Sequence, residues 1–175
     1  VWDLDTVTLA RYCAPLVEEL LKGSLVVLLA VRKRIGFLVD AAIYGFAVGA
    51  GFAVIENIVF LNMMPETATG VWVVRGFGTA IMHGGATAIF AVAGRALASE
   101  RRELGSGAWL PGLGIAIVVH SIFNHFFFAP LLNTALVLVF LPLVMTAVYQ
   151  RSEKTVEDWL DVGFDADTEL LELIN

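Results

Sequence analysis

The amino-acid sequence predicts an all-α polytopic membrane protein, with a bundle of about five transmembrane helices in this chain. Of its 175 residues, 58% are hydrophobic, and the mean hydropathy is +0.81. Both values lie far above those of an ordinary soluble domain. Five apolar runs follow one another, each of about 20 residues or more, which is enough to cross the ~30 Å hydrocarbon core of a bilayer.

Charged residues, glycines and prolines separate the five runs. In the polar lead-in, Asp5, Thr6 or Thr8 is available as an N-cap of the first helix. Asp40 stands near the start of the second run, where it can end or pair with that helix. We expect residues 62–74 to form a loop in which Trp72 is an interfacial anchor. The predicted spans cover about residues 9–31, 35–61, 75–98, 110–128 and 130–150.

The basic residues predict the orientation in the membrane. Three clusters fall at alternate ends of the spans: Arg32-Lys33-Arg34, Arg95 with Arg101 and Arg102, and Arg151 with Lys154. Basic ends are typically cytoplasmic. We therefore predict a multi-pass protein of the cell membrane, with the N-terminus of this chain outside and its C-terminus in the cytoplasm.

Charge also divides the chain into two predicted parts. Residues 1–150 contain nine acids and nine bases, whereas residues 151–175 contain eight acids and two bases. We interpret the first part as a transmembrane core and the second as an acidic cytoplasmic tail. Because no strongly basic surface is predicted, we expect the lipid bilayer as a partner and no nucleic acid.

Two adjacent carboxylates lie deep in the first predicted span. A charge in that position costs about 2.5 kcal/mol or more on insertion scales, so Glu18 and Glu19 each need a partner, a cavity or a chemical role. Lys22 is four residues from Glu18 and shares its helix face, which predicts an ion pair between them. Glu19 points about 100° away and is predicted to remain free for another role.

Four further polar residues lie within later spans: Glu56, His83, His120 and Asn124. Counting about 1.5 Å of rise per residue from the cytoplasmic ends puts all of them, with Glu19, in the middle to outer half of the bilayer. A common site is therefore predicted. Asn124, and Thr87 one turn from His83, can orient the histidines by hydrogen bonds. A purely structural role, in helix–helix hydrogen bonds and an internal salt bridge, is the competing interpretation.

These residues form motifs in a fixed order along four successive spans. The motifs are EELLK (Glu18–Lys22), FAVIEN (Phe52–Asn57), the lone His83 and HSIFN (His120–Asn124). The set, which covers about residues 9–128, resembles the PrsW family of intramembrane proteases, related to the CAAX prenyl endopeptidases and bacteriocin-processing membrane proteins. The CAAX relatives have Arg where this chain has Lys22, which favours the PrsW branch. Because the family usually has more than five spans, the resemblance implies further helices upstream of Val1.

The resemblance implies hydrolysis of a peptide bond within or beside the membrane. The implied substrate is a membrane-anchored protein or peptide, such as an anti-sigma factor. By motif position, the implied functional residues are Glu18, Glu19, Glu56, His83 and His120.

Two hydrolytic mechanisms fit these residue types. Glu56, His83 and His120 offer the His/His/carboxylate ligand set of a catalytic Zn²⁺ site, with Glu19 as the general base. Without metal, Glu19 activates water alone, and His120 and Asn124 stabilise the oxyanion. We take the zinc-assisted protease as the prediction and the metal-free glutamic protease as its alternative.

Two other classes of protein use buried Glu and His side chains. A proton- or ion-coupled transporter is one, because such chains also line ion pathways. Against it, neither Pro nor an internal repeat marks a discontinuous helix in paired halves of this sequence. A non-enzymatic membrane scaffold is the other.

Overall fold

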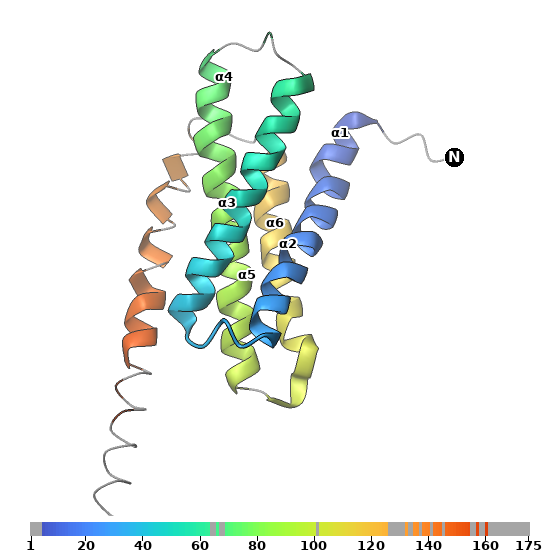
Figure 1. Ribbon diagram of the computed structural model, residues 1–175. Coiled ribbons are helices and arrows are strands. Elements are labelled where there is room, and N and C mark those ends of the chain that lie inside the picture. The colour runs from blue at the N-terminus through green and yellow to red at the C-terminus, as the bar shows by residue number, and fades with distance from the viewer. Residues whose placement is uncertain are drawn as a thin grey trace, which may run out of the picture.

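The computed structural model describes residues 5–63, 66, 69–100 and 102–125. In the C-terminal part it also describes residues 132, 135, 136, 138–140, 142–144, 146–154, 157 and 160. These residues form a bundle of helices, and none of them lies in a strand (Figure 1). The predicted all-α class is therefore confirmed for the described part of the chain.

The first helical rod joins three elements: α1 (Thr6–Thr8), the π-helix η1 (Leu9–Cys13) and α2 (Ala14–Val31). Asp5 caps it, because its Oδ1 accepts from the Thr8 N–H at 2.6 Å. Pro15, at the start of α2, has no N–H to donate to the preceding turn. The Ala14 N–H bonds to the Leu9 carbonyl instead of the Ala10 carbonyl, so the turn before Pro15 is left with free carbonyls.

Helix α3 (Leu38–Met63) runs back along the bundle and begins at a capped N-terminus. The Asp40 carboxylate accepts from the N–H groups of Gly36, at 3.1 Å, and Phe37, at 2.9 Å. These two donors would otherwise be unsatisfied at the helix end. Asp40 was expected to end or pair with this helix, and in the structure it caps the N-terminus of the helix.

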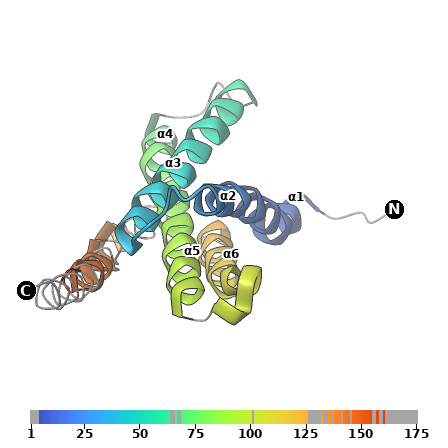
Figure 2. The ribbon, with the colours of Figure 1, turned by 60° about the horizontal axis from the view of Figure 1, so that its bottom comes forward.

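Helix α5 (Ala80–Glu100) is the central element, with buried residues along its length from Met82 to Gly94. It packs closely against α3, whose Gly45 and Gly49 face it. A Cβ built on Gly49 would lie 2.1 Å from the His83 carbonyl oxygen, and one on Gly45 would lie 2.7 Å from that of Thr87. Only glycine allows this approach of the two backbones. Figure 2 shows α5 between α3 and α6.

The segment before α5 differs from the prediction. Residues 62–74 were expected to form a loop, but α4 (Thr69–Val74) and the π-helix η2 (Arg75–Thr79) lead directly into α5. Trp72 packs edge-on against Phe60 of α3, with ring centroids 5.4 Å apart. The apolar residues of α4 continue the hydrophobic run of α5, and this packing outweighs the low helix propensity of their Val and Thr side chains.

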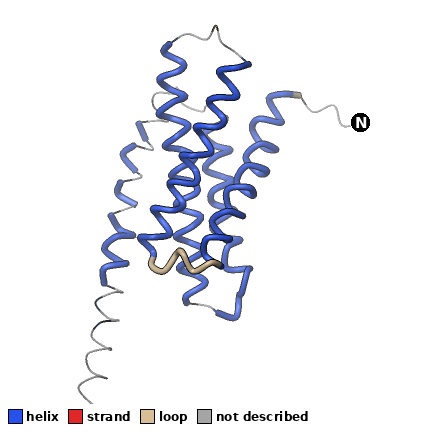
Figure 3. The backbone as a smooth tube through the Cα atoms, in the orientation of Figure 1, coloured by secondary structure: helices blue, strands red, loops and turns tan. Residues whose placement is uncertain are grey.

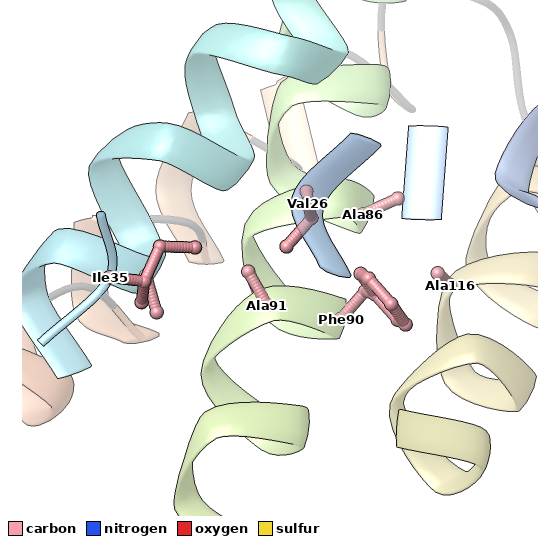
Figure 4. Close-up of a cluster of buried hydrophobic side chains, with 7 residues drawn as sticks. Val26, Ile35, Ala86, Phe90, Ala91 and Ala116 are labelled. Carbon is pink, nitrogen blue, oxygen red and sulfur yellow. The ribbon is translucent and has the colours of Figure 1, made fainter. Parts of the chain in front are cut away.

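The chain continues from α5 through the 3₁₀-helix η3 (Arg102–Trp109) into α6 (Leu110–His125). Gly105, with φ of 51°, provides the turn between them. Figure 3 shows α2 and α3 joined by a short loop. One apolar core joins α2, α5 and α6 through the buried side chains of Val26, Phe90 and Ala116 (Figure 4).

Three helices among the described residues are long and apolar enough to cross a membrane. They span Leu38–Met63, Thr69–Glu100 and Gly105–His125. The first predicted span corresponds to α2, which has 18 residues and carries Glu18, Glu19 and Lys22. Much of the fifth predicted span, 130–150, lies outside the described residues. The protein is an integral membrane protein, and the count of about five spans stays a prediction.

Candidate active site

Four polar side chains from three helices meet in the interior of the bundle. Glu19 and Lys22 come from α2, His83 from α5 and His120 from α6, and each is at most 2% exposed. Two carboxylates lie at the edge of this group, with side chains 21% exposed for Glu18 and 33% for Glu56. Of the residues predicted to share one site, Glu19, Glu56, His83 and His120 lie together, whereas the Asn124 amide bonds to the Ala10 carbonyl.

The ammonium group of Lys22 links α2 to α5. Its Nζ donates to Glu19 Oε1 at 2.5 Å and lies 2.6 Å from His83 Nδ1. The predicted ion pair of Lys22 with Glu18 is therefore wrong, and the pair is formed with Glu19. The reason is rotation of α2, which turns Glu19 and Lys22 together into the interior and leaves Glu18 at its edge.

His120 is held by the carboxylate of Glu19. Its Nδ1 lies 2.8 Å from Glu19 Oε1, and since a carboxylate accepts, Nδ1 carries the proton and donates. The other nitrogen, Nε2, then keeps its lone pair. Glu18 Oε2 lies 3.8 Å from that nitrogen and is buried without a hydrogen-bond partner in the described chain. This oxygen and this lone pair face a common point.

His83 is held at both nitrogens. Its Nδ1 accepts from Lys22, so its Nε2 carries the proton and donates to Glu56 Oε2 at 3.0 Å. Arg75 of η2 donates from Nη2 to the other oxygen of Glu56 at 3.1 Å. The Arg75 guanidinium also stacks 3.9 Å from the centroid of the Phe60 ring.

The sequence prediction missed Arg75 as a member of this cluster. Its signal was nevertheless present, because Arg75 is one of two basic residues, with Arg11, at the predicted outer ends of the spans. A cation there, among apolar residues, needs an acidic partner within reach. Glu56 of the neighbouring helix is that partner.

A possible metal-binding group lies within this cluster. One donor atom each from Glu18, His83 and His120 lie within 4.8 Å of one another. The two imidazole rings stand edge to face, with centroids 4.6 Å apart. The predicted ligand set had Glu56 where this group has Glu18, and Glu56 Oε2 instead accepts from His83 Nε2 at 3.0 Å. The assignment of ligands stays a prediction.

Asn124 and Thr87 were predicted to orient substrate or histidine. The Asn124 amide donates to the Ala10 carbonyl at 2.9 Å, and Ser121 Oγ donates to the Arg11 carbonyl at 2.7 Å. These two carbonyls lack helical partners because Pro15 has no N–H, and the bonds from α6 satisfy them and hold α6 against η1. An oxyanion role for Asn124 would require its bond to open. Thr87 Oγ1 is buried without a hydrogen-bond partner among the described residues, and the His83 bonds are made by other groups.

Comparison of the sequence with known families assigns the chain to a protease family rather than to a transporter or a scaffold. No curated protein and no solved structure matches the chain. The family model described as PrsW family intramembrane metalloprotease matches residues 2–148, which include every residue of the cluster. This chain therefore belongs to the PrsW family of intramembrane metalloproteases and is an intramembrane peptidase.

Proposed function

We propose that the chain hydrolyses a peptide bond of a membrane-associated protein substrate at the group formed by Glu18, His83 and His120, with zinc assistance. One observation carries the proposal. Glu18 Oε2 is buried without a hydrogen bond, 3.8 Å from the nitrogen of His120 that keeps its lone pair. A buried carboxylate oxygen with no partner is costly unless it serves a ligand or a reactant.

The residues fit a zinc ion in chemistry and in spacing. Two imidazoles and one carboxylate are the donor set of many catalytic zinc sites. Donor atoms on one tetrahedral zinc lie about 3.4 Å apart, so the 3.8 Å between Glu18 and His120 requires a small shift, and the set of three, now within 4.8 Å, must draw closer together. His83 would have to exchange its bond to Glu56 for the metal. Zinc held there would polarise the scissile carbonyl and lower the pKa of a bound water.

The protein groups then divide the proton transfers. Glu56, released from His83 and still held by Arg75, would take the proton of the attacking water on its free oxygen. The water oxygen bonds to the carbonyl carbon, the C–N bond breaks, and Glu56 returns the proton to the leaving amine. Glu19 has no direct part, because its Oε1 is engaged by Lys22 and His120. We propose this division in place of the predicted base Glu19.

The metal-free glutamic mechanism remains the second candidate, on one specific observation. Both nitrogens of His83 are engaged by protein groups, Lys22 and Glu56. In that mechanism Glu18 Oε2 takes the proton of the water and returns it to the leaving amine, and the His83 Nε2–H, released from Glu56, donates to the developing oxyanion. Metal content of the purified protein separates the two candidates: one zinc per chain, lost in His120→Ala, is expected, and full activity of metal-free protein would establish the glutamic mechanism.

The test of the peptidase compares Glu18→Gln with the wild type. Each is reconstituted into vesicles with membrane proteins extracted from cells, and new protein N-termini are identified by mass spectrometry. We expect the rate at which new N-termini appear to be several orders of magnitude lower with Glu18→Gln than with the wild type. The melting temperature of Glu18→Gln should stay close to that of the wild type, because Glu18 is not the partner of Lys22. Equal N-termini with both proteins would contradict the proposal.

The wider features implied by the sequence are proposed on the same basis. The Glu18-Glu19 pair and the two histidines support a relation to the CAAX prenyl endopeptidases. The three alternating basic clusters support a location in the cell membrane, with residues 1–150 as the protease core and residues 151–175 as an acidic cytoplasmic tail. A cysteine at Ser106, with Cys13 replaced, should resist an impermeant thiol reagent added to intact cells; labelling from outside would reverse this topology.

A further inference from the structure

An apolar groove runs between α2 and α3 on the side of the bundle away from α6. Its volume is about 470 Å³. Leu21 and Leu25 form one wall, and Tyr44, Val48 and Ile55 are among the residues of the other. Figures 1 and 2 both show α2 and α3 splaying apart along this side.

The floor of the groove belongs to the active site. Lys22 and Phe52 line it, and the Lys22 ammonium lies 4.8 Å from the centroid of the Phe52 ring. Lys22 contacts His83 Nδ1 at 2.6 Å, and the Phe52 ring lies 5.5 Å from the His83 ring, centroid to centroid. An occupant of the groove would therefore be separated from a catalytic histidine by a single layer of side chains.

Helix α3 presents small residues on two faces, and only one face has a partner among the described residues. Gly45 and Gly49 are buried against α5, where a Cβ would collide with its backbone. Ala47 and Gly51 have the same spacing of four residues but line the groove, and a Cβ on Gly51 would meet nothing within 4 Å. Small residues at this spacing allow a second membrane segment to approach a helix closely.

We propose that the apolar membrane-embedded segment of the protein substrate docks in this groove, between α2 and α3, and reaches the catalytic group across Lys22 and Phe52. This inference rests on the proposed function, because it assigns the route by which that site receives its substrate. The occupant follows from two facts. The walls are apolar and open toward lipid, so a polar peptide gains nothing there. The groove is also continuous with the active site of an intramembrane protease, whose substrate is a protein in the membrane.

Filling the groove at Gly51 tests the proposal without disturbing the fold. Gly51→Phe puts a ring into the groove from a position where the added Cβ meets no atom within 4 Å. The matched control is Gly114→Phe on α6, where an added Cβ also meets nothing within 4 Å. The N-termini that depend on Glu18 are measured for both variants. We expect a loss of roughly tenfold or more in Gly51→Phe, since misplacement of a substrate costs up to about 100-fold, and rates near wild type in Gly114→Phe.

Cross-linking identifies what occupies the groove. A photoreactive benzoylphenylalanine is introduced in place of Tyr44, an aromatic residue that already lines the groove, in the Glu18→Gln protein, which is expected to bind substrate without cleaving it. An adduct with an apolar segment next to a Glu18-dependent cleavage site supports the proposal, and an adduct with lipid alone overturns it. Wild-type cleavage by Gly51→Phe overturns the groove but leaves the proposed function standing. Absence of any Glu18-dependent cleavage by the wild type is instead a failure of the proposed function.

Discussion

His83 and His120 lie with their rings 4.6 Å apart, yet their Nδ1 atoms contact groups of opposite charge. His120 Nδ1 faces the carboxylate of Glu19 at 2.8 Å, whereas His83 Nδ1 faces the ammonium of Lys22 at 2.6 Å. A carboxylate fixes the proton on Nδ1 and leaves Nε2 as an acceptor. An ammonium does the reverse, so that His83 Nε2 becomes a donor.

The two histidines are therefore not equivalent as metal ligands. His120 has the arrangement of a metal-binding histidine, because its outer partner is a carboxylate that orients the ring and leaves Nε2 free. His83 has the arrangement of a hydrogen-bond donor, whose present acceptor is Glu56. Zinc binding therefore needs its main rearrangement at His83, which must give up its bond to Glu56. The following predictions test this asymmetry through the groups that create it.

The largest expected effect concerns the Glu19–Lys22 pair. Both side chains are 1% exposed, so removing either charge leaves the other buried without its partner. Glu19→Gln and Lys22→Met should each lower the free energy of unfolding by about 3–5 kcal/mol, the usual cost of breaking a buried pair. The double variant should lose much less than the sum of the two. Unfolding by heat in one detergent measures all three.

The exposed pair Arg151–Glu100 serves as the control for that cycle. Its side chains are 68% and 55% exposed, and Nη2 lies 2.8 Å from Oε1. Glu100→Gln should change the free energy of unfolding by about 1 kcal/mol or less, because solvent screens the pair. If Glu19→Gln proves as harmless as Glu100→Gln, the buried pair does not hold the site together.

The second effect concerns zinc affinity and needs a folded protein without the Glu19 carboxylate. The double variant Glu19→Gln/Lys22→Met provides it. Loss of a carboxylate behind a metal-binding histidine weakens metal binding by about 10–100-fold, and we expect that loss here by calorimetric titration with zinc. Removal of Lys22 acts in the opposite direction, because it frees His83 Nδ1, so any weakening originates at His120. Zinc affinity equal to that of the wild type would mean that Glu19 does not orient His120.

Much of the fold was predictable because hydrophobic runs of membrane length leave few alternatives to helices. The polar residues of the site were also predictable, since Glu18, Glu19 and the histidines stand out against apolar surroundings. Their roles were not. Spacing showed that Glu18 and Lys22 share a helix face, but it could not show how α2 is rotated in the bundle. That rotation gives Lys22 to Glu19 and leaves Glu18 as the open carboxylate.

A similar limit explains Asn124. One turn from His120, its position suggested an orienting or catalytic amide. Its actual partner is the Ala10 carbonyl, which is free because Pro15 interrupts the hydrogen bonds of the preceding turn. The interruption could be read from the sequence, since proline has no N–H. Which side chain would satisfy the carbonyl depended on the packing of α6, which periodicity does not fix.

The smallest expected effect concerns Arg75, on the His83 side of the site. Its guanidinium contacts Glu56 at 3.1 Å, and both side chains are partly exposed, at 23% and 33%. Arg75→Leu should cost about 1 kcal/mol or less in stability, as for other screened pairs. It should slow cleavage only a few-fold, because the Glu56 carboxylate that takes the proton remains in the site and only its other oxygen loses a partner.

Arg75→Lys separates the charge of Arg75 from its geometry. Lysine keeps the positive charge beside Glu56 but loses the planar guanidinium that stacks on Phe60 at 3.9 Å. If charge alone matters, Arg75→Lys should cleave a Glu18-dependent substrate at the wild-type rate; if the stacked guanidinium positions Glu56, it should resemble Arg75→Leu. The initial rate and the KM for one such substrate measure this. A complete loss of cleavage in Arg75→Leu, with the protein folded, would show that Glu56 cannot work without Arg75, and the small effect expected of this pair would be wrong.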